Sequence, residues 1–156
     1  MLEEQFTTLI QGYGKSVGIN NLLIHDGYKI FLTFKPNIKI DFQWRSKTED
    51  ILVFSNLLRI SNYNQDFLVE LLNANYFWSK SNGATLSIDS ATDCIFLTDR
   101  WTLQALESIE SLTAAINRFV ATAKHWKSIA QDNEYSESRA NHDNSSFYLQ
   151  NNFIRG

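Results

Sequence analysis

Residues 71–88 read LLNANYFWSKSNGATLSI, and they contain the end of an apolar helix, a turn and the start of a strand. The helix is predicted over about 65–79, where Asn64 can cap its N-terminus. Asn82–Gly83 is a helix stop and a turn signal. Two strands are predicted next, near 84–89 and 94–99, joined by a polar turn. This stretch therefore predicts a helix followed by an antiparallel hairpin.

The helix predicted over 65–79 is apolar around much of its circumference. Its large apolar side chains are Phe67, Leu68, Leu71, Leu72, Tyr76 and Trp78. A surface helix of a monomer usually keeps one polar face, and a single sheet could not cover this much apolar surface. Because exposed apolar area on a soluble protein generally marks a protein interface, we expect this helix to form one.

The chain before this helix predicts another helix and three strands. Apolar residues at three- and four-residue spacing mark a helix from Leu2 to Val17, which Gly18 can end. The strands are predicted at about 28–35, 38–45 and 51–58. Strict alternation in the second is typical of a half-buried antiparallel strand, whereas the third is apolar on both faces.

The chain after the hairpin predicts a long helix and a polar tail. Thr102 is a candidate N-cap, and an apolar stripe continues to Ile129. From residue 131 the composition changes to Asn, Ser and acidic residues, so we expect a domain over 1–130 and a flexible tail over 131–156. The fold class is α+β, with three helices and an antiparallel sheet of about five strands in the order α-β-β-β-α-β-β-α.

Composition limits the functional classes. A chain of 156 residues with 44% hydrophobic residues is the size of one domain with a sizeable core. A net charge of −3 argues against nucleic-acid binding, which needs phosphate neutralisation. Cys94 is the single cysteine, so an internal disulfide and Cys-rich zinc motifs are excluded. No apolar run reaches the roughly 20 residues of a membrane helix, and the acidic start is unlike a signal peptide. We expect a soluble cytosolic protein.

A search for catalytic residues finds no constellation. His25, His125 and His142 lie far apart in the sequence, and none has a second ligand at metal spacing. We expect exposed histidines and a buried structural thiol at Cys94. The sequence contains no phosphate-binding loop, dinucleotide fingerprint or nucleophile elbow. It therefore predicts a protein that is not an enzyme and has no cofactor and no metal.

The order of these features resembles the CesT/Tir-chaperone family, the class I effector chaperones of bacterial type III secretion. The residues that carry the resemblance are Leu71, Leu72, Asn75, Phe77, Trp78, Gly83, Leu86 and Ile88. The other elements match in order over roughly residues 3–130. The chain departs from the family in Asn82–Gly83, which replaces the usual double glycine, and in a weaker acidic charge. Residues 131–156 lie outside the shared core.

The resemblance implies a homodimer of the bacterial cytoplasm that acts without ATP and without catalysis. It would hold the N-terminal segment of a secreted effector in a soluble, non-globular form and present it to the secretion apparatus, whose ATPase is a further candidate partner. No nucleic-acid or membrane partner is expected. The implied dimer contact is the second helix, at Leu68, Leu71, Leu72, Asn75 and Trp78.

The effector is expected to bind apolar surface on the first helix and the neighbouring strands. The candidate residues are Phe6, Ile10, Tyr13, Ile40 and Phe42. An unfolded partner offers backbone groups and scattered apolar side chains, so its receiver needs sheet edges and shallow grooves. The alternative is that the same side chains simply form the core.

Two other functions stay open at this stage. An α+β sheet curved around a helix can enclose a small-molecule pocket, as in cone-shaped ligand-binding or lyase-type domains. His25, Asp41 and Tyr28 are the polar candidates for such a pocket. The third reading is a chaperone-like fold that acts as a regulator, which the sequence does not separate from an effector chaperone.

Overall fold

The computed structural model describes residues 2–61 and 64–151, with side chains through residue 136. Three α-helices and a five-stranded antiparallel sheet follow one another in the predicted order α-β-β-β-α-β-β-α. The elements are α1 (Leu2–Ser16), β1 (Lys29–Phe34), β2 (Ile38–Arg45), β3 (Asp50–Arg59), α2 (Gln65–Asn75), β4 (Thr85–Asp89), β5 (Cys94–Trp101) and α3 (Ile109–Asn151). Two short 3₁₀ segments join them, η1 (Tyr76–Trp78) and η2 (Leu103–Ala105).

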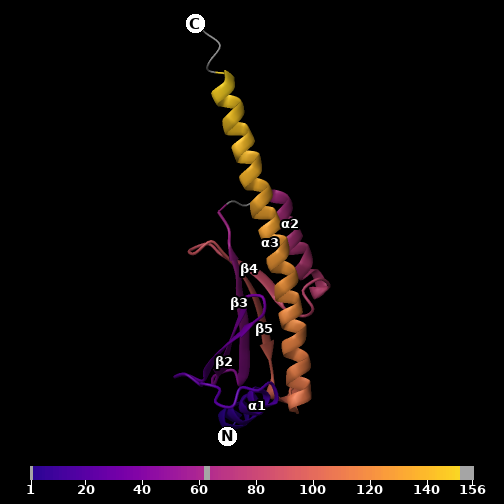
Figure 1. Cartoon of the computed structure of the whole chain (residues 1–156). Helices are drawn as coiled ribbons and strands as arrows, with labels where there is room; N and C mark the ends of the chain where they lie inside the picture. Colours follow the sequence, from indigo (N-terminus) through magenta and orange to yellow (C-terminus); the bar gives the residue numbers. More distant parts are fainter. Residues whose placement is uncertain (1, 62–63, 152–156) are drawn as a thin grey trace.

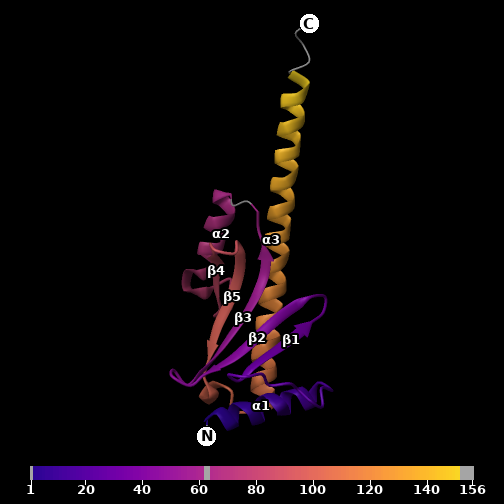
Figure 2. The same cartoon turned by 90° about the vertical axis from the view of Figure 1, so that its left-hand side faces the viewer.

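The fold has two layers, because α2 and α3 lie on the same side of the sheet. The strand order is β1-β2-β3-β5-β4, so β1 and β4 are the edge strands. Helix α3 runs along the sheet, α2 lies next to it beside β4, and α1 crosses the lower end of the sheet (Figure 1). In the turned view the strands lie in front of α3, and no helix covers them from that side (Figure 2).

The core lies between this sheet and the helices. In β2 the strict alternation is confirmed, because Ile38, Ile40, Phe42 and Trp44 are buried and the residues between them are more exposed. Helix α3 contributes the largest fully buried side chain, Trp126, whose indole Nε1 donates a hydrogen bond to the Lys80 carbonyl at 3.0 Å. This bond ties the α2–β4 connection to α3.

The second helix is shorter than predicted. Asn64 caps it as expected, with its side-chain oxygen accepting a 2.7 Å bond from the Phe67 N–H. The helix ends at Asn75 rather than near residue 79, because Tyr76 leaves helical geometry with ψ of 109°. Asn82 and Gly83 then form the predicted turn, both with positive φ.

The last helix begins later than Thr102, and the predicted N-cap is wrong. Thr102 instead caps the 3₁₀ segment η2, where its hydroxyl accepts a bond from the Ala105 N–H. Ser108 and Ser111 start α3, because each serine N–H donates to the other side-chain oxygen, at 3.0 and 3.2 Å. Such a reciprocal pair satisfies two N–H groups that the first turn leaves free.

Helix α3 passes through the predicted domain boundary at residue 130 and continues to Asn151. Two residues beyond that boundary contact the segment before α2. The Asn64 amide donates to the Asn133 side-chain oxygen at 2.7 Å, and the Ser61 N–H donates to the Glu134 carboxylate. The helical segment therefore extends past the boundary, while the flexibility of 131–156 stays a prediction.

A buried carboxylate fastens the β2–β3 turn to β5. The side chain of Asp50 is 3% exposed and forms ion pairs with Arg45 and Arg100. Thr48 is a third partner, and its hydroxyl donates a bond to the carboxylate at 2.8 Å. The bond from Arg45 is the main cause that holds the pKa of the Asp50 carboxyl group well below its usual range.

Replacing this carboxylate should destabilise the fold. We expect Asp50→Asn to lower the free energy of unfolding by about 2 kcal/mol, less than for a fully buried pair because both arginines are partly exposed. Urea unfolding of both proteins at pH 7 measures this difference. The exposed neighbour Glu49 supplies the control, since Glu49→Gln should change little.

The same variant has a defined pH dependence. The pKa of aspartate in the unfolded chain is about 4, whereas the pKa of Asp50 in the folded chain is lower. The unfolded chain therefore binds more protons in acid, and the stabilisation is complete above about pH 5 and declines as the pH falls below about 4. The difference in the free energy of unfolding between wild type and Asp50→Asn should therefore decrease below about pH 4. A difference that stays constant down to pH 2 would contradict the assignment.

Candidate functional site

Helix α2 and the segment η1 present a group of exposed apolar side chains, here named the α2 patch. Its members are Val69, Leu72, Tyr76, Phe77 and Trp78, with exposed fractions of 46% to 78%. Exposed large apolar side chains that gather on one surface of a protein mark a site of interaction. Helix α2, which carries part of this patch, lies beside β4 at one edge of the sheet (Figure 2).

Backbone conformation holds the aromatic part of the α2 patch. Phe77 and Trp78 both have positive φ, 50° and 51°, in the left-handed region that non-glycine residues rarely adopt. The rings of Tyr76 and Phe77 lie 4.4 Å apart, and the Trp78 indole N–H donates to the Thr85 hydroxyl at 3.3 Å. Strained conformations of this kind gather at functional sites.

A small cavity of 280 Å³ lies between α2 and β4. Its lining residues are Leu68, Leu71, Leu72, Asn75, Leu86, Ser87 and Ile88. Four of the five residues predicted for the dimer contact therefore line one cavity, while the fifth, Trp78, lies in the α2 patch. Leu72 is 71% exposed, but Leu71 is buried in the core and Leu68 is half-buried.

Asn75 has an intramolecular role that its position in the sequence did not reveal. Its side-chain oxygen accepts a 2.8 Å bond from the Leu86 N–H, and its amide donates a 2.9 Å bond to the Leu86 carbonyl. The amide thereby imitates a neighbouring strand at the outer edge of β4. The exposed residues Val69, Tyr76 and Phe77 were not among those predicted for the contact, although three successive aromatic residues were a visible signal.

The opposite edge of the sheet carries a second apolar surface. A cavity of 660 Å³, here named the β1 cavity, is lined by the end of α1, the loop after it and β1. Its apolar side chains include Leu23 and Phe31, which are 73% and 53% exposed, together with Val17 and Ile19. In the described part of the chain, no strand pairs with the outer edge of β1 beyond the bridge between His25 and Lys29.

The five residues predicted to contact cargo are all buried within this chain. They are Phe6, Ile10, Tyr13, Ile40 and Phe42, each 3% exposed or less. Their apolar stripe exists as predicted, but α1 turns it toward the sheet and α3, where Phe6 stacks on Trp44. The expectation that these side chains form an accessible surface is corrected accordingly: they are core, and the accessible apolar residues nearby are those of the β1 cavity.

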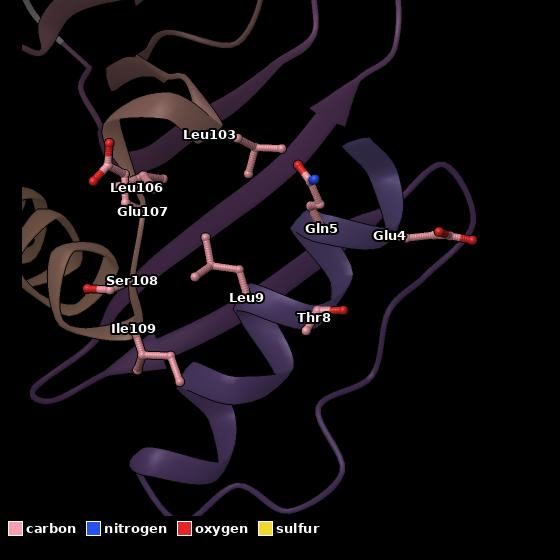
Figure 3. Close-up of a pocket in the computed structure, with 9 residues that line it drawn as sticks. All are labelled: Glu4, Gln5, Thr8, Leu9, Leu103, Leu106, Glu107, Ser108 and Ile109. Atoms are coloured by element: carbon pink, nitrogen blue, oxygen red, sulfur yellow. The ribbon is translucent and has the colours of Figure 1, made fainter. Parts of the chain in front are cut away.

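A third cavity, of 880 Å³, lies between α1 and the segment that leads into α3. Leu9 points from α1 toward Leu103 and Leu106 (Figure 3). The polar side chains in the lining are Glu4, Gln5, Thr8, Glu107 and Ser108.

The polar candidates for a small-molecule pocket do not converge. His25 lines the β1 cavity and packs against the Phe31 ring at 5.1 Å, but neither Asp41 nor Tyr28 lines that cavity. His125 contacts Trp126 on α3, and the side chain of His142 lies outside the described residues. Cys94 is buried, as predicted. Among the described residues, no three His, Cys, Asp or Glu side chains form a group that could hold a metal ion.

Comparison with known proteins identifies the family that has this architecture. The sequence model of the Tir chaperone protein (CesT) family matches residues 8–127. The chain belongs to this family. The matched segment of this CesT-family chain extends from α1 into α3 and includes the whole sheet. No curated protein sequence matches the chain significantly.

Solved structures share the fold of this CesT-family chain at low sequence identity. A chain in the crystal structure of the ExsC–ExsE complex superimposes with a TM-score of 0.70 at 15% identity, covering 81% of this chain and 94% of that one. The HopA1–SchA chaperone–effector complex gives 0.62 at 16% identity, covering 81% and 93%. The Yersinia pestis type III secretion chaperone SycH, in complex with a fragment of YscM2, gives 0.61 at 14% identity, covering 77% and 98%. Within residues 2–61 and 64–151, no helix of the CesT-family chain has the length and hydropathy of a membrane span.

The role of Asn75 can be tested through stability. Asn75→Ala leaves the outward N–H and carbonyl of Leu86 without their partner, so it should lower the free energy of unfolding by about 1–3 kcal/mol. Asn73→Ala is the matched control, because Asn73 lies two residues earlier with an exposed side chain. Urea unfolding at one protein concentration measures both. Equal midpoints for the two variants would show that the amide does not stabilise β4.

Proposed function

We propose that this protein is a homodimeric chaperone that holds an extended segment of a secreted effector and presents it to a type III secretion apparatus. The observation that carries the proposal is the placement of two exposed apolar surfaces on opposite edges of one sheet, in a chain of the CesT family. One surface would join two copies of the chain. The other would receive the cargo.

The α2 patch is the proposed dimer contact. Its five side chains are exposed in the single chain, and the cavity beside them is lined by leucines and Ile88. A second copy would cover this apolar surface, as obligate dimer interfaces resemble a protein core that has been divided. Leu72 and Trp78 keep the role proposed from the sequence, and Asn75 acts through β4. Leu68 and Leu71 support the contact from the cavity between α2 and β4.

The β1 edge is the proposed cargo contact. His25 exchanges backbone hydrogen bonds with Lys29, and the next outward backbone groups along the strand are those of Phe31 and Thr33. A cargo segment added here would gain main-chain hydrogen bonds and could place an apolar side chain in the β1 cavity. This mode suits an unfolded partner, because it requires no prior shape in the cargo.

The chemistry of the chain supports a binding role rather than catalysis. Among the described residues, the pKa of Asp50 is lowered by contacts that hold the fold together, and the pKa of Asp41 is raised by burial. We propose that the protein acts without ATP in the bacterial cytoplasm, with the secretion ATPase as a candidate partner. The structural neighbours include the HopA1–SchA chaperone–effector complex and the secretion chaperone SycH, which supports this assignment.

The dimer prediction concerns Leu72. Leu72→Asp places a charge in the middle of the proposed interface and should convert dimer to monomer at micromolar concentration. Leu23→Asp is the matched control, because Leu23 is equally exposed on the opposite edge and should leave the dimer intact. Multi-angle light scattering measures both masses. A monomeric wild type, or a dimer in Leu72→Asp, would remove the basis for this contact.

The cargo prediction reverses these roles. Candidate secreted proteins are co-expressed with the chaperone, and the amount of soluble cargo that co-purifies with it is measured. Leu23→Asp should reduce the amount of co-purified cargo by about tenfold or more, since it replaces an exposed leucine of the β1 cavity by a charged side chain. The variant should remain folded and dimeric. Wild-type recovery by Leu23→Asp would exclude the β1 cavity as the cargo site.

A further inference from the structure

The sheet has one face that no helix covers. Helices α2 and α3 lie on the other side, α1 crosses the lower end of the sheet, and the strands face the viewer in the turned view (Figure 2). Along each strand the buried residues alternate with residues that are exposed or half-buried. The uncovered side of an antiparallel sheet is usually polar.

One row across this open face departs from that rule. In the strand register, Asp41 of β2 lies between Phe31 of β1 and Phe54 of β3. The Phe54 ring lies 6.4 Å from the ring of Phe96 on β5. Opposite residues of neighbouring strands share a face and lie about 5 Å apart. The open face therefore places one carboxylate between two phenylalanines, with a third close by.

Within the described residues, the Asp41 carboxylate has the charge of Lys39 nearby but no directly bonded partner. In the described part of the chain, no hydrogen bond or ion pair involves its oxygens, in contrast to Asp50, which is bonded to two arginines and a threonine. Asp41 is half-buried, and burial raises the pKa of its carboxyl group, while the charge of Lys39 lowers it. The approach of a cation stabilises a partly desolvated carboxylate that has no hydrogen bond.

The two rings beside Asp41 favour the same kind of ligand. A guanidinium or ammonium group is attracted to the face of an aromatic ring, and the methylene stem of arginine packs on apolar surface. Arginine suits this arrangement better than lysine, because its planar group stacks on rings and pairs with carboxylates. Lys29 and Lys39 lie on the same face, so the surface repels a run of basic residues and accepts a single one.

We propose that the open face binds an extended apolar segment of the cargo that places one isolated arginine on Asp41, between Phe31 and Phe54. This proposal rests on the proposed chaperone function and adds to it a selection rule for the cargo. Phe31 belongs both to this row and to the lining of the β1 cavity. A segment added at the β1 edge can therefore continue across the open face.

The test uses two synthetic probes on the full-length protein. The first is a labelled extended peptide of alternating valine and serine with one central arginine, and the second carries citrulline, which keeps the shape of arginine without its charge. Fluorescence anisotropy gives Kd for each peptide. The wild type should bind the arginine peptide about five- to tenfold more tightly than the citrulline peptide.

The variants assign this preference to Asp41. Asp41→Asn should abolish it, whereas Asp66→Asn, which removes an exposed carboxylate on α2, should preserve it. Asp41→Lys should bind a peptide with central glutamate more tightly than the arginine peptide. Equal affinities for arginine and citrulline in the wild type, or a preference that persists in Asp41→Asn, would overturn the proposal.

Two further measurements separate this proposal from its alternatives. A change in the mass of Asp41→Asn by light scattering would mean that a second copy of the chain covers the open face, and it would overturn the assignment to cargo. The co-expression assay tests the chaperone function independently. Soluble cargo recovered by the wild type, together with no arginine preference, would overturn only the selection rule.

Discussion

The contact between helix α3 and the middle of the sheet supports every other feature of this molecule. Strand β3 is central, and its residues Val53 and Leu57 are buried in one core with Ile116 and Ala123 of α3. A sheet of five strands is stable only when one face is removed from water, because burial of apolar surface is the main favourable term in folding. Helix α1 closes the end of this core, and α2 is held at its side by bonds to α3 and β4.

A chain of this size covers one face of its sheet and leaves the other face and the edges to other uses. The residues that could serve a partner are therefore found where the core ends. The α2 patch lies at the β4 edge and the β1 cavity at the opposite edge, with the open face between them. In η1, the positive φ values of Phe77 and Trp78 interrupt the helical path, and the aromatic side chains of this segment stay exposed.

Local patterns in the sequence were sufficient for the elements but not for what covers each apolar face. Alternation located β2 correctly, and Asn64 marked the start of α2, because both signals act within a few residues. The stripe of Phe6, Ile10 and Tyr13 was also real. The sequence did not reveal what covers this stripe, since an apolar stripe looks the same whether the chain's own core or a partner covers it. Thr102 and Ser108 are both acceptable N-caps by residue type, and only the path of the chain after β5 selects Ser108 for α3.

The bond between Asn75 and Leu86 has a consequence for the solubility of the protein. Fibres form when a free edge of one sheet pairs with a different free edge of the next copy, so that growth never closes. In this chain the outward groups of Leu86, at the second position of a five-residue strand, are already satisfied by an amide. At this position the β4 edge has no free backbone groups to offer to another strand. Head-to-tail stacking of sheets through this part of β4 is thereby disfavoured.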